Sequence, residues 1–295
     1  MWRIWYSFIT VGDIMRAFHT LSTKYGAEKI TLYDFELLIM ILSALEWKRH
    51  NGEIVLHTDK KCKEHIDGVG ISFIWDEIIV SLDEFHSLKI NEDCFWAACK
   101  LYALSLETAP CVMMDLDFIV WNKMDFNLIK CDVKTIHSED VNNDVYPKKN
   151  FFNFSNKYSF SDNFDWNIKA SNTAFAYFKN ENFKNIYCRE AFKFIKNVIV
   201  EKSGWDALPY MVFAEQRLLS MLASSYNYSL KWFSNIEELF SNNQQLFTHI
   251  WGEKMNLKKY KEARSDFCHM CVNKIKKEFP SEYKVLMNLP WFKFV

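Results

Sequence analysis

Two aspartates one residue apart, Asp115 and Asp117, follow an apolar run at residues 109–114. Such a run predicts a buried strand, in which alternate side chains share a face, so we expect both carboxylates to point the same way. Two carboxylates on one face repel each other unless a cation lies between them. The pair therefore predicts half of a divalent-metal site, although a strand that leads into a solvated acidic turn would have the same sequence.

The segments that would position these aspartates alternate along the chain. We expect a helix at 31–50, which begins at a capping-box-like Thr31 and Asp34 and ends at Asn51 and Gly52. The other expected elements are strands at 4–7, 53–57, 71–82 and 109–114, a loop and helix at 10–25, and a helix at 91–106. This order predicts an α/β fold with a mostly parallel sheet flanked by helices.

Polar residues stand at the ends of the expected strands. Ligands bind open α/β sheets at the carboxyl ends of the strands. Ser7, Thr58 and Asp59 fall at such ends, as does the aspartate pair. Their position favours the functional interpretation of the aspartates.

The second half of the chain is less regular. We expect strands at 133–136 and 171–178, helices at 182–200, 210–225 and 257–277, and a distinct aromatic and polar stretch at 246–254. Residues 142–165 show no clean period. A long irregular stretch inside a compact domain is often a binding loop, so it could cover an acceptor pocket, and a disordered excursion would look the same.

Composition limits the class of protein. The 295 residues are 49% hydrophobic and 25% charged, a balance typical of a folded domain, and the formal charge of −1 argues against general nucleic-acid binding. The first eight residues lack a signal-peptide pattern, and the longest apolar run, 37–42, is far shorter than the ~18–20 residues that span a bilayer. The eight cysteines are therefore expected to be reduced thiols of a cytoplasmic protein.

Three other patterns carry less weight. Cys268 and Cys271 have Cys-x-x-Cys spacing, but no second pair is nearby to complete a zinc site. No Gly-x-Gly-x-x-Gly, Walker or Gly-x-Ser-x-Gly motif is present, which argues against Rossmann dinucleotide, P-loop and α/β-hydrolase sites. The lysines near the C-terminus alternate with glutamate, as on a solvated helix face, and with the aromatic tail they could also contact an anionic membrane surface.

Three further motifs follow the aspartate pair. Asn172-Thr173-Ala174 begins a predicted strand, Glu215-Gln216 lies on a predicted helix, and His249-Ile250-Trp251-Gly252-Glu253-Lys254 belongs to the aromatic and polar stretch. With Asp115-Leu116-Asp117, and in this order, they resemble the GT-A class of nucleotide-sugar-dependent glycosyltransferases. The nearest pattern is that of the retaining, family-8-like galactosyl- and glucosyltransferases and the bacterial capsule and lipopolysaccharide enzymes near them.

The resemblance implies a role for each motif. Asp115, Asp117 and His249 would hold Mn²⁺ or Mg²⁺, which with Lys254 would stabilise the departing diphosphate. Glu215 and Gln216 would orient the donor sugar and its anomeric carbon. The other expected donor-binding residues are Leu116, Asn172, Gly252 and, by position alone, Tyr6, Ser7, Thr58, Asp59 and Lys100.

The sequence departs from the family pattern at several points. Thr173 and Ala174 stand where Ala and Gly are usual, so only Asn172 transfers from that motif. A glutamate replaces an aspartate before Gln216, and one residue is missing between the glycine of the last motif and Lys254.

We therefore predict a single GT-A-like domain over 1–295, with a nucleotide- and metal-binding half (1–130), a donor-sugar and acceptor half (131–255) and a helical extension (256–295). It would transfer a hexose from a nucleotide diphosphate sugar, UDP first in line, to a carbohydrate or lipid-linked glycan acceptor. Such transfer would serve bacterial surface polysaccharide or glycan synthesis, in the cytoplasm or at the inner face of the membrane. Two alternatives stay open: a nucleotidyltransferase or metal phosphohydrolase with the same carboxylate pair, or a non-catalytic nucleotide- or sugar-binding protein.

Overall fold

The structure, a computed structural model, describes residues 14–24, 27, 30–155, 158–234, 246–250 and 252–294. Its main strands are β1 (Ala17–Leu21), β2 (Ile54–Thr58), β3 (Glu77–Val80), β4 (Cys111–Met114), β6 (Val133–Thr135), β10 (Phe175–Phe178) and β12 (Leu230–Trp232). They form one sheet in the order β12-β6-β10-β4-β1-β2-β3. β10 runs antiparallel to both neighbours, and all other pairs of this sheet are parallel. The predicted mostly parallel α/β sheet is confirmed, and both halves of the chain contribute strands to it.

Three antiparallel strand pairs lie outside the main sheet. β5 (Phe118–Val120) pairs with β13 (Phe247–His249), β7 (Ser138–Glu139) with β9 (Ala170–Ser171), and β8 (Asn153–Phe154) with β11 (Val198–Ile199). The first two pairs join segments far apart in the sequence, and they carry residues that matter for the site.

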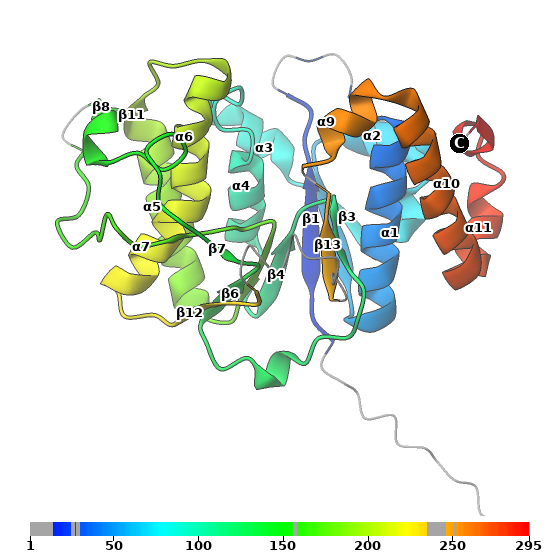
Figure 1. Cartoon of the computed structure of the whole chain (residues 1–295), viewed down its shortest axis with the longest axis horizontal. Coiled ribbons are helices and arrows are strands. Elements are labelled where there is room, and N and C mark those ends of the chain that lie inside the picture. Colours follow the sequence, from blue (N-terminus) through cyan, green and yellow to red (C-terminus); the bar gives the residue numbers. More distant parts are fainter. Residues whose placement is uncertain are drawn as a thin grey trace, which may run out of the picture.

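Helices cover both faces of the sheet (Figure 1). One face carries α1 (Asp34–His50), α2 (Lys60–Val69), α9 (Lys254–Lys259), α10 (Lys261–Glu278) and α11 (Pro280–Leu286). The other carries α3 (Leu82–Ser87), α4 (Ala98–Leu106), α5 (Glu181–Asn197), α6 (Leu208–Val212) and α7 (Leu218–Ser225), with a π-helical turn, η5 (Phe213–Arg217), between α6 and α7. Short 3-10 turns lie at η1 (Ser72–Ile74), η2 (Phe126–Leu128), η3 (Lys149–Phe151), η4 (Gly204–Ala207) and η6 (Trp291–Phe294).

The central strands are buried on both sides, and their side chains alternate between two hydrophobic cores. In β4, Val112 and Met114 pack into the core under α1, whereas Cys111 and Met113 pack into the core under α4, α5 and α7. This follows from the two-residue period of a strand. Parallel strands covered on both faces need apolar residues at nearly every position, which is why the strand before Asp115 is a continuous apolar run.

The N-terminal elements differ from the prediction. The strand expected at 4–7 lies outside the described residues, and β1 (Ala17–Leu21) occupies part of the segment expected to be a loop and helix. Helices α2 and α3 were not predicted. Because β1 is only five residues long and buried on both faces, it has neither the length nor the polar alternation that separates a strand from a helix in sequence.

Helix α1 begins later than its sequence suggests. Its N-cap is Tyr33, whose backbone N–H donates to the Glu36 carboxylate at 2.9 Å, so the capping box lies two residues after the predicted Thr31 and Asp34. The predicted end at Asn51 is confirmed. The helix is buried on nearly all sides because the sheet covers one side and α10 the other.

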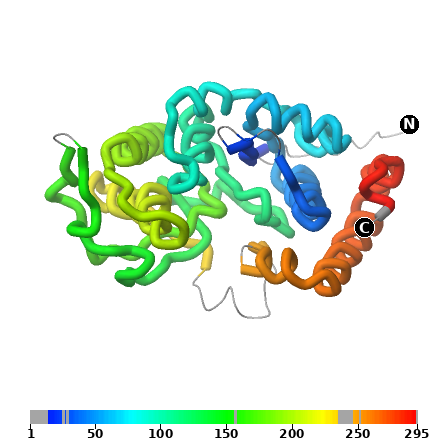
Figure 2. The backbone as a smooth tube through the Cα atoms, turned by 90° about the horizontal axis from the view of Figure 1, so that it is seen from above, coloured from blue at the N-terminus to red at the C-terminus, as the bar shows by residue number. Residues whose placement is uncertain are grey.

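The irregular segment at 142–165 is held at the end of the molecule away from α10 and α11 (Figure 2). Three backbone carbonyls in and beside it, those of Tyr146, Pro147 and Trp166, accept hydrogen bonds of 2.5–2.7 Å from the buried guanidinium of Arg217. Aromatic rings of the segment, including Phe152 and Phe160, pack against α5 and η5. The described part of this segment is therefore an ordered loop with its own anchors.

The basic C-terminal helices are tied to α1 by ion pairs. Lys258 Nζ lies 2.8 Å from Glu36, Arg264 Nε 3.5 Å from Asp34, and Lys274 Nζ 3.7 Å from Glu46. Acidic residues of α1 therefore neutralise part of the positive charge of these helices. Among the described residues, no helix has both the length and the apolar character needed to cross a membrane.

Candidate functional site

Asp115 and Asp117 lie in a tight turn. β4 ends at Met114, and the Phe118 N–H donates to the Asp115 carbonyl at 3.1 Å, which turns the chain into β5. The expectation that both aspartates belong to one strand is therefore wrong in conformation. The turn still brings the carboxylates together, since oxygens of Asp115 and Asp117 and a ring nitrogen of His249 all lie within 4.8 Å of one another.

His249 reaches the aspartates through a backbone pairing. It is the last residue of β13, where it faces Phe118 of β5, and the next residue, Ile250, donates its N–H to the Asp117 carbonyl at 3.2 Å. His249 Nε2 lies 3.7 Å from Asp117 Oδ2. Burial lowers the pKa of His249 to about 4, although Asp117 raises it, so the imidazole is neutral at pH 7 and keeps a lone pair for a metal.

Two lysines face the same carboxylates. Lys254, the first residue of α9, brings its Nζ to 2.8 Å from Asp117 Oδ2. Lys100 of α4 is buried and lies between two acids, with Nζ 2.6 Å from Asp115 Oδ1 and 2.5 Å from Glu215 Oε1. Burial lowers the pKa of Lys100, but the two carboxylates together have the larger effect. The pKa therefore lies above its ordinary value, and the ammonium stays charged.

The two aspartates differ in their affinity for protons. Burial raises the pKa of Asp115 to about 6, and Asp117 adds to this, while Lys100 opposes it. The pKa of Asp117 lies below its ordinary value, because His249 and Lys254 together outweigh the effect of burial. Asp117 is thus the more firmly ionised of the pair.

Glu215 belongs to the π-helical turn η5. Its carboxylate accepts from Thr173 Oγ1 at 2.8 Å as well as pairing with Lys100, and its backbone carbonyl accepts from Tyr187 Oη at 2.5 Å. π-helical turns inside α-helices are frequent at functional sites because they shift the side chains that follow. Here Glu215 lies against Lys100, which also contacts Asp115, and Arg217 reaches the irregular segment.

Asn172 and Gln216 meet through residues that the sequence motifs do not include. Asn172 Oδ1 accepts from the Ala174 N–H at 3.1 Å, and its Nδ2 donates to Glu139 Oε1 at 2.9 Å. Tyr146 Oη lies 2.7 Å from Glu139 Oε2 and 2.5 Å from Gln216 Oε1. Thus Glu139 and Tyr146 join the two residues that were expected to contact the donor sugar.

One signal could have identified Glu139. β6 runs parallel to β4, since each is antiparallel to β10, so their carboxyl ends lie at the same edge of the sheet. Glu139 comes shortly after β6, just as Asp115 follows β4. Tyr146 gives no such signal, because it lies in the irregular segment and reaches Gln216 only through the tertiary structure.

The remaining predicted donor-binding residues lie as follows. Thr58 ends β2, and Asp59 caps α2 while also accepting the Thr23 N–H at 2.5 Å. Leu116 occupies the turn between the aspartates, and Gly252 lies in the turn before α9. Tyr6 and Ser7 lie outside the described residues.

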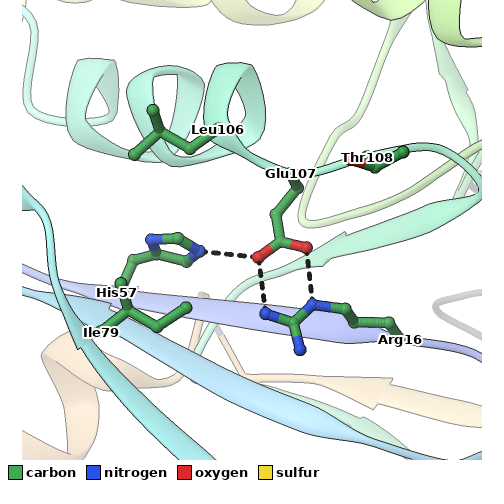
Figure 3. Close-up of a pocket in the computed structure, with 6 residues that line it drawn as sticks. All are labelled: Arg16, His57, Ile79, Leu106, Glu107 and Thr108. Carbon is green, nitrogen blue, oxygen red and sulfur yellow. Dashed lines mark hydrogen bonds and ion pairs between the residues drawn. The ribbon is translucent and has the colours of Figure 1, made fainter.

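A separate cavity of about 360 Å³ lies between the C-terminal end of α4 and the sheet (Figure 3). Glu107 accepts from Arg16 Nε at 2.7 Å and lies 2.9 Å from His57 Nε2. Arg16 and Thr108 precede β1 and β4, while His57 and Ile79 belong to β2 and β3, and none of Asp115, Asp117 and His249 lines this cavity. Its charged groups are paired with one another.

The Cys-x-x-Cys pair has no metal-site partners among the described residues. Cys268 and Cys271 are buried against the core under α1, and the potential metal group found in the described part of the chain is Asp115, Asp117 and His249. Two carboxylates and a neutral imidazole suit a divalent cation, and the imidazole favours Mn²⁺ over Mg²⁺. The donor set therefore fits the predicted metal.

Comparison with known proteins gives a family and a set of similar folds. A family described as a family of unknown function, DUF6734, matches residues 15–289. No curated protein matches the chain. The similar solved structures include the PaToxG glycosyltransferase (15% identity, 77% of this chain and 72% of that chain, TM-score 0.39) and mouse xyloside xylosyltransferase 1 in its apo form (8%, 75% and 85%, 0.40). HddC from Yersinia pseudotuberculosis is also similar (11%, 59% and 80%, 0.31). Likeness at these scores says nothing of substrate or mechanism.

Proposed function

This chain belongs to the family of unknown function DUF6734, and we propose that it is a metal-dependent glycosyltransferase of the GT-A class. The observation that carries the proposal is the convergence of Asp115, Asp117 and His249 within 4.8 Å. These residues come from segments far apart in the chain, and they lie at the carboxyl edge of a mostly parallel sheet, where such folds bind ligands. Lys254, at 2.8 Å from Asp117, adds the cation expected beside a diphosphate.

In the proposed reaction, the bond between the anomeric carbon and the diphosphate oxygen breaks. A bond forms between the same carbon and the oxygen of an acceptor hydroxyl, and the proton of that hydroxyl passes to the departing diphosphate. A divalent cation held by Asp115, Asp117 and His249 would offset the charge that develops on the diphosphate. The Lys254 ammonium would leave Asp117 and bind the diphosphate oxygens, where it would act as a point charge.

Glu215 and Gln216 would orient the donor sugar. Glu215 is suited to this because Lys100 and Thr173 fix its carboxylate at 2.5 and 2.8 Å. A group held in one place before substrate arrives costs less to organise in the transition state. Asn172, fixed by Ala174 and Glu139, would contact the same sugar.

The finer assignments follow the resemblance of the four motifs. The donor would be a UDP-hexose and the acceptor a carbohydrate or lipid-linked glycan of a bacterial surface polysaccharide, with retention of configuration at the anomeric carbon. Basic residues of α10 that are not paired to α1 would allow contact with the inner face of a membrane. Division of the single domain into nucleotide, acceptor and helical parts belongs to the same proposal.

Metal binding is the first test. At a concentration of Mn²⁺ about 100 times Kd, binding stabilises the folded state by ~2.7 kcal/mol, which raises Tm by about 5 °C in a chain of this length. Wild type should show this shift and Asp117→Asn should lose it. The matched control is Asp206→Asn, which removes an exposed aspartate of η4 and should keep the full shift.

Product analysis is the second test. UDP-, GDP- and CMP-sugars are supplied with Mn²⁺, and slow donor hydrolysis is followed by the nucleotide released. A nucleoside diphosphate released from a UDP- or GDP-sugar, or CMP from a CMP-sugar, supports a glycosyltransferase. A nucleoside monophosphate together with a sugar 1-phosphate would indicate a metal phosphohydrolase. Pyrophosphate released when a nucleoside triphosphate and a sugar 1-phosphate are supplied instead would indicate a nucleotidyltransferase. Sugar binding that is independent of Mn²⁺ and without turnover would point to a non-catalytic binding protein.

A further inference from the structure

Glu139 is an acidic residue at the edge of the candidate site that the four motifs do not include. It ends β7, whose pairing with β9 places it opposite Ala170, two residues before Asn172. Its side chain is about one quarter exposed, at 24%. The carboxylate therefore lies where a substrate can reach it while the backbone around it is fixed.

In the described part of the chain, no lysine or arginine lies within ion-pair distance of the Glu139 carboxylate. Its oxygens accept from the Asn172 amide at 2.9 Å and face the Tyr146 hydroxyl at 2.7 Å, both of which are neutral groups. Among the described residues, its ion-pair contact within 4.0 Å is with His137 Nε2, at 3.9 Å. The other three carboxylates of the candidate site differ, because each of them faces a lysine ammonium. Lys100 pairs with Asp115 and Glu215, and Lys254 pairs with Asp117.

The proton of Tyr146 cannot satisfy both of its neighbours. Burial and Glu139 raise the pKa of Tyr146 above its ordinary value, so the phenol keeps its proton. A hydroxyl has one proton, yet Tyr146 Oη lies 2.7 Å from Glu139 Oε2 and 2.5 Å from Gln216 Oε1. If the proton goes to Glu139, the Gln216 amide can turn its N–H₂ to Tyr146 and present its oxygen elsewhere. If it goes to Gln216, Glu139 Oε2 lacks that donor. In either case one acceptor remains for a hydroxyl from outside the protein.

We propose that Glu139 is a specificity residue of the donor pocket, which accepts a hydroxyl of a neutral sugar and repels a sugar acid. The inference rests on the proposed glycosyltransferase function, and it narrows the donor to neutral sugars. A carboxylate beside Asn172 and Gln216 binds hydroxyl groups well because a charged acceptor forms the stronger hydrogen bond. A uronate carboxylate in the same position would lie beside the Glu139 carboxylate in a partly buried site, with no lysine or arginine among the described residues to offset the repulsion.

The test compares neutral and acidic donors in matched pairs. The full-length chain is given UDP-glucose or UDP-glucuronate, and UDP-galactose or UDP-galacturonate, with Mn²⁺, and kcat/KM is measured from UDP release. Wild type should favour each neutral donor by at least about tenfold, the order of discrimination expected from one charged hydrogen bond. The rise in Tm caused by each donor reports binding without depending on turnover.

Glu139→Gln tests the residue itself. It keeps the shape but removes the charge, so kcat/KM for the neutral donors should fall about tenfold, and the ratio of neutral to acidic donors should fall by at least as much. The matched control is Glu190→Gln on α5, a partly buried glutamate that pairs with Lys193 at 3.6 Å, and it should leave the ratio unchanged. If Glu139→Gln fails to fold, Glu139→Asp takes its place. Aspartate keeps the charge, but its shorter side chain moves the carboxylate away from the sugar, so activity with the neutral donors should fall while the acidic donors remain rejected.

The outcomes separate the two proposals. If none of the four donors binds, the assignment of a UDP-sugar donor is wrong and this inference falls with it, while GDP- and CMP-sugars still test the glycosyltransferase proposal. If donors are hydrolysed but UDP-glucuronate is used as well as UDP-glucose, or if Glu139→Gln leaves the ratio unchanged, only the role of Glu139 is overturned. Neutral preference in wild type that is lost in Glu139→Gln, and kept in Glu190→Gln, supports it.

Discussion

Replacement of Lys100 by methionine tests how the acidic side of the site is held. Lys100 Nζ lies 2.6 Å from Asp115 Oδ1 and 2.5 Å from Glu215 Oε1, and the side chains of Lys100 and Glu215 are each 7% exposed. Methionine has a similar length and no charge, so Lys100→Met leaves two neighbouring carboxylates without their shared cation. Removal of one partner from a buried ion pair costs about 3–5 kcal/mol, because the remaining charge stays buried and unpaired.

The expected loss can be measured by denaturation. A decrease of about 3–5 kcal/mol in the free energy of unfolding lowers Tm by about 6–10 °C in a protein of this size. The control is Lys193→Met on α5, which removes an exposed lysine that pairs with the partly buried Glu190 and should change stability by less than about 0.5 kcal/mol. Added Mn²⁺ should raise Tm more in Lys100→Met than in wild type, since the carboxylates then lack the competing ammonium.

A double variant distinguishes charge from packing. Glu215→Gln removes one of the two carboxylates that Lys100 neutralises, so Lys100→Met combined with Glu215→Gln should cost less than the sum of the single changes by about 1–3 kcal/mol. A loss below about 1 kcal/mol in Lys100→Met, or strict additivity in the double variant, would refute the view that Lys100 holds two carboxylates together.

Three further predictions concern the fold. Burial raises the pKa of Glu107, but His57 and Arg16 have the larger effect and hold it at about 2, below its ordinary value of 4.5. This shift contributes about 3 kcal/mol to the stability of the folded state. The contribution should be present in full above pH 4.5 and vanish as the pH falls toward 2. Glu107→Gln and wild type should thus differ in urea unfolding at pH 7, and the difference should shrink steadily as the pH falls from 4.5 toward 2. Arg217→Met should cost at least about 3 kcal/mol and speed hydrogen exchange in the irregular segment, because three carbonyls lose their donor at about 1 kcal/mol or more each. Gly52→Ala should lower stability by at least about 2 kcal/mol in thermal unfolding, since φ is +134° and a Cβ would lie 2.7 Å from the Met15 backbone nitrogen.

The aspartates of the candidate metal site were predictable from sequence for a local reason. An apolar run that ends in two acids indicates a strand that is buried on both faces and that ends at the edge of the sheet. Both features can be inferred from residues that are consecutive in the sequence. The prediction nevertheless assigned the wrong conformation, because the chain turns at Asp115 and does not continue as a strand. The carboxylates converge through that turn.

Several elements were beyond the reach of periodicity. β1 has five residues and is covered on both faces, so its sequence shows no alternation of polar and apolar residues. Helix α1 is enclosed by the sheet and by α10, so its apolar residues form no single stripe, and its length and end signals identified it. Burial on all sides removes the contrast that sequence patterns depend on.

By itself, the sequence determined the α/β class with a mostly parallel sheet, the acids at the end of one buried strand, and the order of the motifs that follow. The tertiary structure alone decided which polar side chains meet. His249 reaches Asp117 because β13 pairs with β5, Lys254 follows from that pairing, and Tyr146 reaches Glu139 and Gln216 because Arg217 anchors its loop. Contacts of this kind depend on the register between segments far apart in the chain, and no local pattern of residues records that register.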